Sequence, residues 1–270
     1  MSSASHSEID ARYRYACDIA RAAASRALSW YQQRQTLVVE HKRDLQDVVS
    51  EADRNVEALI RTLIAERFPE DAVYGEESGG EVQGAPFIWV VDPIDGTACF
   101  VNGLPNWCVS LAVVCEGEPV IGVVCDPNHH ELFHARAGQG AWVNERRMAV
   151  HGATQLNEGL LGISNGSRVA GDGVSHLING LIAQGGMFIR VGSGALTSAW
   201  AAAGRLIGYY EAHMHAWDGL PGIVLMREAG GITNDYLRNE GLKNGNPVLL
   251  ANATLYPQIK ALTGNSALDE

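Results

Sequence analysis

The sequence predicts an α+β protein in which helices pack on two sheets, and two observations carry that prediction. In the first half of the chain, helical patterns precede short apolar runs bounded by turn residues. In the second half, strand-like and helical patterns alternate, which indicates helices layered on a second sheet. We expect one domain over residues 1–270, with an α+β half over about 1–150 and an α/β half over about 151–270.

Two helices are expected at the start of the chain. Residues 8–33 repeat small or apolar side chains every three or four positions, which places them on one helical face. The second helix should begin at Ser50, because Ser50 and Asp53 have the spacing of a capping box. It should end at Phe68, which precedes a proline.

A mainly antiparallel sheet is expected next, followed by the alternating half. The first strands are predicted at residues 87–91, 109–115, 120–125, 131–136 and 141–144, with a hairpin turn at Gly117-Glu118-Pro119. The later strands are predicted at 160–164, 187–191, 206–211 and 247–251, and the later helices at 195–204, 220–230 and 255–262. Residues 164–175 are expected to be the most loosely structured stretch of the chain.

Composition narrows the possible partners and location. A net charge of -11 opposes binding to a nucleic acid polymer, although bound cations allow small phosphates to bind. No apolar run approaches the ~18–20 residues of a membrane span, and the polar N-terminus does not resemble a signal peptide. Five cysteines without a C-x-x-C pair argue against a disulfide framework. Cys108, Cys115 and Cys125 lie in apolar, strand-like runs and are expected to be small buried residues. A cytoplasmic protein is therefore expected.

The segment Asp92-Pro93-Ile94-Asp95-Gly96-Thr97 is the most informative in the chain. It follows an apolar strand, where carboxylates are costly unless a positive charge lies between them. Two carboxylates and the Ile94 carbonyl oxygen suit a hard divalent cation, and Pro93 restricts the turn. The N–H groups of Gly96 and Thr97 suit a phosphate. The alternative interpretation is a polar turn after a buried strand.

Further acidic residues have both a structural and a functional interpretation. Glu76 lies in a polar turn that is either a solvated loop or part of a metal site. Asp218 is expected to be the N-cap of the helix over 220–230, a position from which a carboxylate can also face a metal. Asp47 and Asp53 can also belong to this acidic set, and their structural interpretations are a surface charge and a cap partner, respectively.

The order of these segments resembles the inositol monophosphatase family across nearly the whole chain. The matching segments are Asp47-Val-Val-Ser-Glu-Ala-Asp53, Gly75-Glu-Glu-Ser78, Asp92-Pro-Ile-Asp-Gly-Thr97, Gly138-x-Gly140-Ala141, Gly192-Ser-Gly-Ala195, Trp217-Asp218 and Glu228-Ala-Gly-Gly231. The resemblance implies a layered α-β-α-β-α sandwich, and it implies a homodimer because members of the family are commonly dimers. It also implies hydrolysis of a small phosphorylated metabolite with two or three Mg²⁺ ions.

The resemblance also implies roles for individual residues. The implied Mg²⁺ ligands are Glu76, Asp92, the Ile94 carbonyl, Asp95 and Asp218. Thr97, with Asp47 or Glu76, is implied to orient and deprotonate the attacking water. The implied substrate contacts are Ile94, Asp95, Gly96, Thr97, Gly192, Ser193, Gly194, Glu211 and Asp218.

Several residues depart from the family pattern, and several functions remain open. Ala98, Cys99, Leu220 and Pro221 are departures, and Pro221 is expected in a first helical turn, where no N–H is needed. Inositol monophosphate is the first candidate substrate; histidinol phosphate, 3′-phosphoadenosine 5′-phosphate and fructose 1,6-bisphosphate are alternatives. A catalytically silent binding or regulatory homologue is a different class.

A third class is a transition-metal protein. It would use His129, His130 and His134 as ligands, but the run Pro127-Asn128-His129-His130-Glu131 is more typical of a hairpin turn. His213 and His215, which precede Trp217, are expected to be local packing residues.

Overall fold

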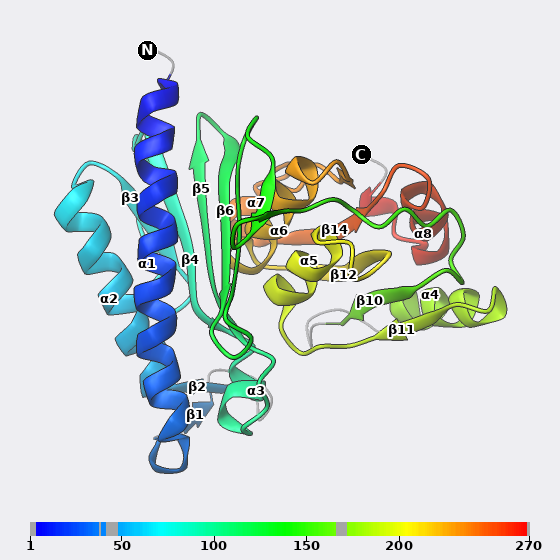
Figure 1. Ribbon diagram of the computed structural model, residues 1–270, viewed down its shortest axis with the longest axis horizontal. Helices are drawn as coiled ribbons and strands as arrows, with labels where there is room; N and C mark the ends of the chain where they lie inside the picture. Colours follow the sequence, from blue (N-terminus) through cyan, green and yellow to red (C-terminus); the bar gives the residue numbers. More distant parts are fainter. Residues whose placement is uncertain (1–3, 38, 42–47, 166–171, 269–270) are drawn as a thin grey trace.

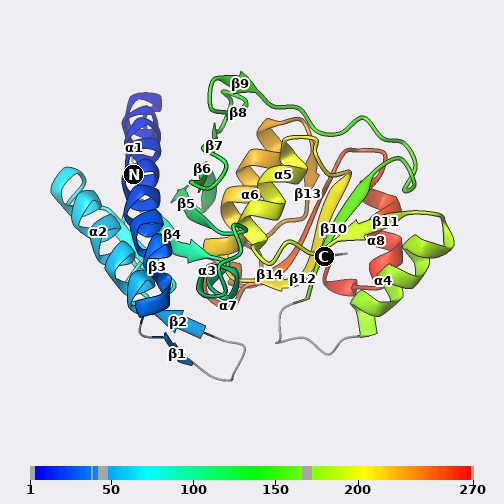
Figure 2. The same cartoon turned by 60° about the horizontal axis from the view of Figure 1, so that its bottom comes forward.

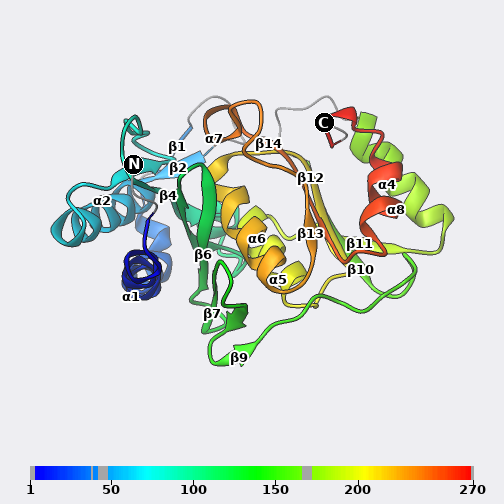
Figure 3. The same cartoon turned by 90° about the horizontal axis from the view of Figure 1, so that it is seen from above.

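The computed structural model describes residues 4–37, 39–41, 48–165 and 172–268, and it has the layered architecture expected from the sequence. Figure 3 shows the layers in order: the outer helices, the first sheet, the central helices, the second sheet and the far helices. The outer helices on the first sheet are α1 (His6–Gln32) and α2 (Glu51–Arg67). The central pair is α5 (Gly194–Ala202) and α6 (Ala216–Glu228), and the far pair is α4 (Asp172–Ala183) and α8 (Tyr256–Thr263).

The first sheet has seven strands in the order β3-β4-β5-β6-β7-β8-β9, which is the order of the chain. Every neighbouring pair is antiparallel except β3 and β4, which are parallel. The strands are β3 (Ala72–Gly75), β4 (Phe87–Asp95), β5 (Cys108–Cys115), β6 (Glu118–Asp126), β7 (Glu131–Arg136), β8 (Ala141–Val143) and β9 (Arg146–Arg147).

The second sheet has five strands in the order β11-β10-β12-β14-β13, and all of them except β13 are labelled in Figure 1. β10 is parallel to both β11 and β12, whereas β14 is antiparallel to both of its neighbours. The strands are β10 (Leu160–Ser164), β11 (Met187–Ile189), β12 (Gly208–Met214), β13 (Ile232–Thr233) and β14 (Asn246–Ala251). A separate ribbon of β1 (Val39–His41) and β2 (Val48–Ser50) lies beside the short helix α3 (Thr97–Val101), as Figure 2 shows.

Three hydrophobic clusters hold these layers together. One joins α1 and α2 to the first sheet, one fills the space around α5 and α6 between the sheets, and one lies under α4 and α8. All eight residues of β5 are buried, as expected for a strand covered on both faces. The five cysteines are free and buried, which confirms the interpretation of Cys108, Cys115 and Cys125 as small core residues.

The local signals for the first two helices are confirmed. Ser50 and Asp53 form the expected capping box at the start of α2, and Phe68 is its C-cap residue. The glycine motif after β7 also has a structural role, since Glu228 of α6 accepts the N–H groups of Gly138 (2.8 Å) and Gly140 (2.7 Å). The glycine motif at Gly138 and the motif that begins at Glu228, about 90 positions apart, therefore form one contact between a turn and a helix.

The helix that carries Asp218 begins earlier than the sequence predicts. α6 begins at Ala216 with His215 as its N-cap residue, so Asp218 is a residue of the first turn and not the N-cap. Pro221 is consequently an interior residue of α6, and the expectation that it lies in the first turn is wrong. His215 stacks on Trp217 with ring centroids 4.6 Å apart, in keeping with a packing role.

Two smaller expectations are also corrected. The turn between β5 and β6 is Glu116-Gly117, both with positive φ (53° and 82°), and Glu118 already belongs to β6. α4 was not predicted, and its first residues lie in the stretch 164–175 that was expected to be the most loosely structured. Among the described residues, no helix combines the length and apolar content that a bilayer crossing requires.

Candidate active site

The end of β4 brings two aspartates to the same place. Asp92 pairs with Ser110 and Asp95 with Cys108 across the β4–β5 ladder, and the register shifts between these pairs. The irregularity follows from Pro93, which has no N–H for the ladder. Asp92 Oδ1 instead accepts the N–H of Ile94 at 2.8 Å. Both carboxylates are buried, with 2% of Asp92 and 8% of Asp95 exposed.

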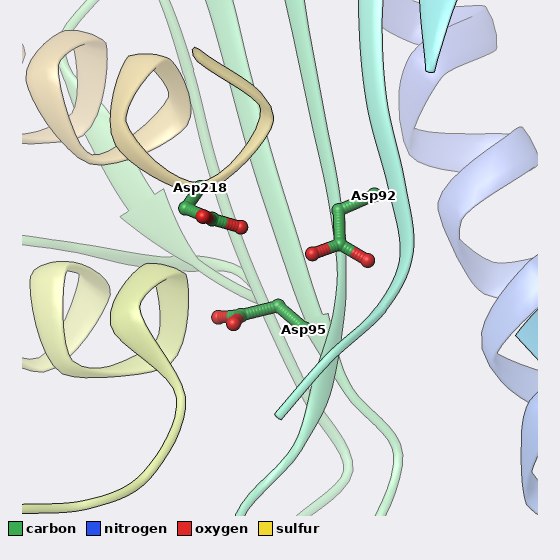
Figure 4. A group of neighbouring side chains, drawn as sticks. All are labelled: Asp92, Asp95 and Asp218. Atoms are coloured by element: carbon green, nitrogen blue, oxygen red, sulfur yellow. The ribbon is translucent and has the colours of Figure 1, made fainter. Parts of the chain in front are cut away.

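Asp218 completes a carboxylate cluster from the opposite side. One oxygen each from Asp92, Asp95 and Asp218 lies within 4.8 Å of the others, and no second such group of three metal-ligating side chains occurs in the described part of the chain. Figure 4 shows the three side chains converging on a common point from β4 and from the first turn of α6. Glu76 follows β3 and donates its N–H to the Val91 carbonyl at 3.1 Å.

The electrostatics of the cluster call for a cation. Burial raises the pKa of Asp92 and of Asp218 well above its ordinary value, and the charges of neighbouring carboxylates raise both further. Burial also raises the pKa of Asp95. The Glu76 charge contributes to all three increases. Several carboxylate oxygens around one point match the ligand preference of Mg²⁺, whose charge would offset this repulsion.

Asp95 is held by the start of α5. Its carboxylate accepts the Ser193 hydroxyl at 2.5 Å, the Ala195 N–H at 2.7 Å and the Gly194 N–H at 3.4 Å. These bonds favour the ionised form of Asp95 and partly oppose the effect of burial on its pKa. Ser193 itself is 2% exposed, so its hydroxyl is committed to Asp95.

Thr97 begins α3 directly after the carboxylate turn. Gly96 has a φ of 97°, and a Cβ there would lie 2.7 Å from the Asn106 carbonyl oxygen, so the turn requires glycine. Thr97 Oγ1 lies 3.2 Å from Asp53 Oδ1 and 3.1 Å from the Ile94 carbonyl oxygen. Asp53 is fully buried. Through its contact with Thr97 it connects the N-terminus of α2 to this turn, and it also closes the capping box.

The functional connection of Asp53 was missed in the sequence. In the sequence, the capping-box spacing from Ser50 already gives Asp53 a structural role. No local sequence pattern links Asp53 to a threonine 44 positions away. Asp47, which with Glu76 was one of the two alternative partners predicted for Thr97, lies outside the described residues.

A cavity of about 420 Å³ opens beside Asp95 and Asp218. Its lining includes five of the predicted substrate-contact residues, Asp95, Gly192, Gly194, Glu211 and Asp218, together with the family departures Ala98 and Cys99. The sequence did not point to the remaining lining residues, which are Asn102, Leu104, Ser164, Asn165 and Arg190. They come from loops and strand ends that carry no motif of their own.

Glu211, which lines this cavity, has a pKa near neutrality. It is 9% exposed and accepts a hydrogen bond from the Tyr209 hydroxyl. Burial raises its pKa to about 7, while Tyr209, the positive charge of Arg190 and a hydrogen bond with Ser164 act in the opposite direction. Its protonation therefore changes at the pH where most enzymes work.

The histidines proposed for a transition-metal site are not brought together as one. His129 Nδ1 lies 2.7 Å from Asp126 Oδ2 in the turn after β6. His134 is bonded on both sides, to the Tyr13 hydroxyl at 2.5 Å and the Asn144 carbonyl oxygen at 2.9 Å. These partners give the histidines structural roles in a hairpin, as the turn interpretation expected.

Comparison with known proteins agrees with the fold and the motifs. The model of the inositol monophosphatase family matches residues 8–267. Inositol-1-monophosphatase of Synechocystis is 38% identical over 208 residues, which are 73% of this chain and 70% of the relative. Nus factor SuhB of Pseudomonas aeruginosa is 35% identical over 216 residues, 77% of this chain and 80% of the relative.

A solved structure extends the agreement to the whole fold. The crystal structure of the suppressor protein SuhB from Bartonella henselae has a TM-score of 0.87 and 29% identity, and the alignment covers 94% of this chain and 99% of that one. Sequence motifs, layer order and solved relatives thus point the same way. The chain belongs to the inositol monophosphatase family of phosphatases.

Proposed function

We propose that this phosphatase hydrolyses a small phosphomonoester with Mg²⁺, and that inositol monophosphate is its first candidate substrate. The observation that carries the proposal is the cluster of Asp92, Asp95 and Asp218, of which Asp92 and Asp95 are buried, beside a cavity of about 420 Å³. The cavity is large enough for a cyclitol or sugar phosphate and is open to the cluster.

The proposed ligands of two or three Mg²⁺ ions are Asp92, Asp95, Asp218, Glu76 and the carbonyl oxygen of Ile94. When bound, these ions neutralise the phosphate and lower the pKa of a coordinated water. The chain supports this chemistry by fixing its carboxylates, as the three donors on Asp95 illustrate. Asp92 and Asp95 come from the first half and Asp218 from the second, so we propose one functional domain.

We assign Thr97 to orientation of the attacking water. Because its hydroxyl proton is directed to Asp53 or the Ile94 carbonyl, the lone pairs of Oγ1 remain able to accept a hydrogen bond from that water. Glu76 or Asp47 would then take the proton, and Asp53 would hold Thr97 in place.

The rest of the substrate is assigned to the cavity. Gly96 and Thr97 would bind the phosphate at their N–H groups, next to Ile94, Asp95 and Asp218. Gly192 and Gly194 line the cavity wall, and the Glu211 carboxylate would accept hydrogen bonds from ring hydroxyls. Ser193 would act on the substrate through Asp95, to which its hydroxyl is bonded.

The proposal is tested by phosphate release from a panel of phosphomonoesters, with and without Mg²⁺. The panel contains inositol 1-phosphate, histidinol phosphate, 3′-phosphoadenosine 5′-phosphate and fructose 1,6-bisphosphate. We expect metal-dependent release with the highest kcat/KM for inositol 1-phosphate. A higher kcat/KM for another member reassigns the substrate. Release from none of them by folded protein in Mg²⁺ would favour the silent binding homologue.

A further inference from the structure

The carbonyl group of Trp217 has lost its usual partner within α6. In an α-helix this oxygen would accept the N–H of the residue four positions later. That residue is Pro221, which has no N–H, so the helix cannot supply the bond. The peptide group affected joins Trp217 to Asp218 and therefore sits directly before a proposed metal ligand.

Ser110 supplies the missing hydrogen bond from another layer of the fold. Its hydroxyl donates to the Trp217 carbonyl oxygen at 2.6 Å. Ser110 is fully buried in β5 and is the register partner of Asp92 in β4. The Ser110 side chain thus connects the strand position opposite Asp92 to the peptide group that precedes Asp218.

The surroundings leave little freedom for α6 to satisfy the carbonyl by moving. A Cβ on Gly122 of β6 would lie only 2.6 Å from the Pro221 carbonyl oxygen, so helix and sheet are already in close contact. On its other side, a Cβ on Gly222 would lie 2.3 Å from Ser198 Cβ of α5. The turn of α6 that contains Pro221 and Gly222 is therefore enclosed between β6 and α5.

We infer that Ser110 is a positioning residue of the metal site, and that the interior Pro221 makes its hydroxyl necessary. Ser110 replaces the helical hydrogen bond that Pro221 deletes and thereby fixes the Asp218 carboxylate relative to Asp92. The inference rests on the proposed function, since it assigns a consequence for Mg²⁺ binding. A structural hydroxyl without this role would affect stability but not the affinity for the cation.

The test is a double-mutant cycle on Mg²⁺ affinity. Wild type, Ser110→Ala, Pro221→Ala and the double variant are unfolded thermally at increasing Mg²⁺, which gives an apparent Kd without a catalytic assay. Thr263→Val is the matched control, because Thr263 is also buried and its hydroxyl also donates to a carbonyl, that of Lys260 at 2.7 Å in α8. The kcat for inositol 1-phosphate is measured on the same preparations.

We expect Ser110→Ala to raise the apparent Kd for Mg²⁺ by about tenfold or more. Pro221→Ala alone should change it by less than about twofold. In the double variant the new N–H of residue 221 can bond Trp217, so most of the lost affinity should return. Thr263→Val should leave the affinity unchanged.

Unchanged Mg²⁺ affinity in Ser110→Ala would overturn the inference, and so would a double variant that loses as much affinity as Ser110→Ala alone. Failure of the proposed function would be distinguishable, because it would show in the wild type as neither Mg²⁺-dependent stabilisation nor phosphate release. If Ser110→Ala does not fold but the double variant folds and binds Mg²⁺, the dependence on Pro221 is supported.

Discussion

The hydroxyl of Ser193 donates to Oδ2 of Asp95 at 2.5 Å, although the two residues are 98 positions apart. Ser193 also caps α5 by accepting the Leu196 N–H at 3.2 Å. One buried hydroxyl therefore orients a carboxylate of the cluster and stabilises the start of a helix between the two sheets.

Replacement of Ser193 should reduce stability measurably. Ser193→Ala removes both a hydrogen bond to a buried carboxyl and a helix cap, so we expect a loss of about 2 kcal/mol or more. Ser193→Thr keeps the hydroxyl and should recover most of it. Urea unfolding of the metal-free proteins measures the difference; a loss in Ser193→Ala below about 0.5 kcal/mol would contradict it.

Without metal, the carboxylate cluster should destabilise the fold as pH rises. Asp92, Asp95 and Asp218 have a pKa raised above the ordinary value, so the folded state binds protons more tightly than the unfolded state. Their contribution to stability is present at low pH and is lost as pH rises through the raised values. Mg²⁺ replaces those protons, and its stabilising effect should grow with pH.

Thermal unfolding from about pH 5 to about pH 8, in EDTA and in Mg²⁺, measures this effect. Asp218→Asn is the control, because it removes one charge from the cluster and leaves all other titrating groups in place. In EDTA, the Tm of wild type should fall relative to that of Asp218→Asn as pH rises. Parallel Tm curves for the two proteins would contradict the account.

Thr97 should affect turnover more than metal binding. Thr97→Ala removes the hydroxyl that would orient the water, and we expect kcat to fall by about 10²–10⁴-fold. The Mg²⁺ concentration for half-maximal stabilisation should change little. Thr97→Ser keeps the hydroxyl and should retain most of the activity, which separates a chemical role from a packing role. A kcat for Thr97→Ala within about threefold of wild type would exclude the assignment.

Substrate binding should depend on the protonation of Glu211. Its pKa is raised to about 7, and only the carboxylate accepts hydrogen bonds at both oxygens, so KM should fall as pH rises through that value. Arg190→Ala removes a positive charge that lowers the pKa of Glu211, and the midpoint should move to higher pH. Glu211→Gln should abolish the pH dependence of KM that arises from Glu211, whereas the pH dependence that arises from titration of the substrate phosphate should remain. An identical pH profile of KM in wild type and Glu211→Gln would contradict the assignment of Glu211 as a substrate contact.

Much of the fold followed from local sequence signals, and the exceptions have physical causes. The capping box of Ser50 and Asp53 is a short-range interaction, and it placed the start of α2 correctly. The start of α6 was predicted wrongly for two reasons. Its N-cap is His215, a residue type with no strong capping preference. A proline in a helical segment is also usually found in the first turn, whereas Pro221 lies in the interior of α6. Tertiary packing overrides that preference here.

The candidate site was predictable in its parts but not in its connections. The residues of the Asp92–Thr97 segment are neighbours in sequence, so their convergence could be expected. The bonds from Thr97 to Asp53 and from Ser110 to Trp217 join positions 44 and 107 residues apart, and no periodicity reports such contacts. The same holds for Arg190, a single charge whose place in the cavity depends on the whole fold.

The central claim is that the carboxylate cluster binds the metal that catalysis needs. The most direct test is a Mg²⁺ titration of phosphate release from inositol 1-phosphate by wild type and Asp218→Asn, with circular dichroism to verify the fold of both. Wild type should show saturable activation by Mg²⁺, whereas folded Asp218→Asn should show no turnover at any concentration. Near-normal, Mg²⁺-dependent turnover by Asp218→Asn would contradict the claim.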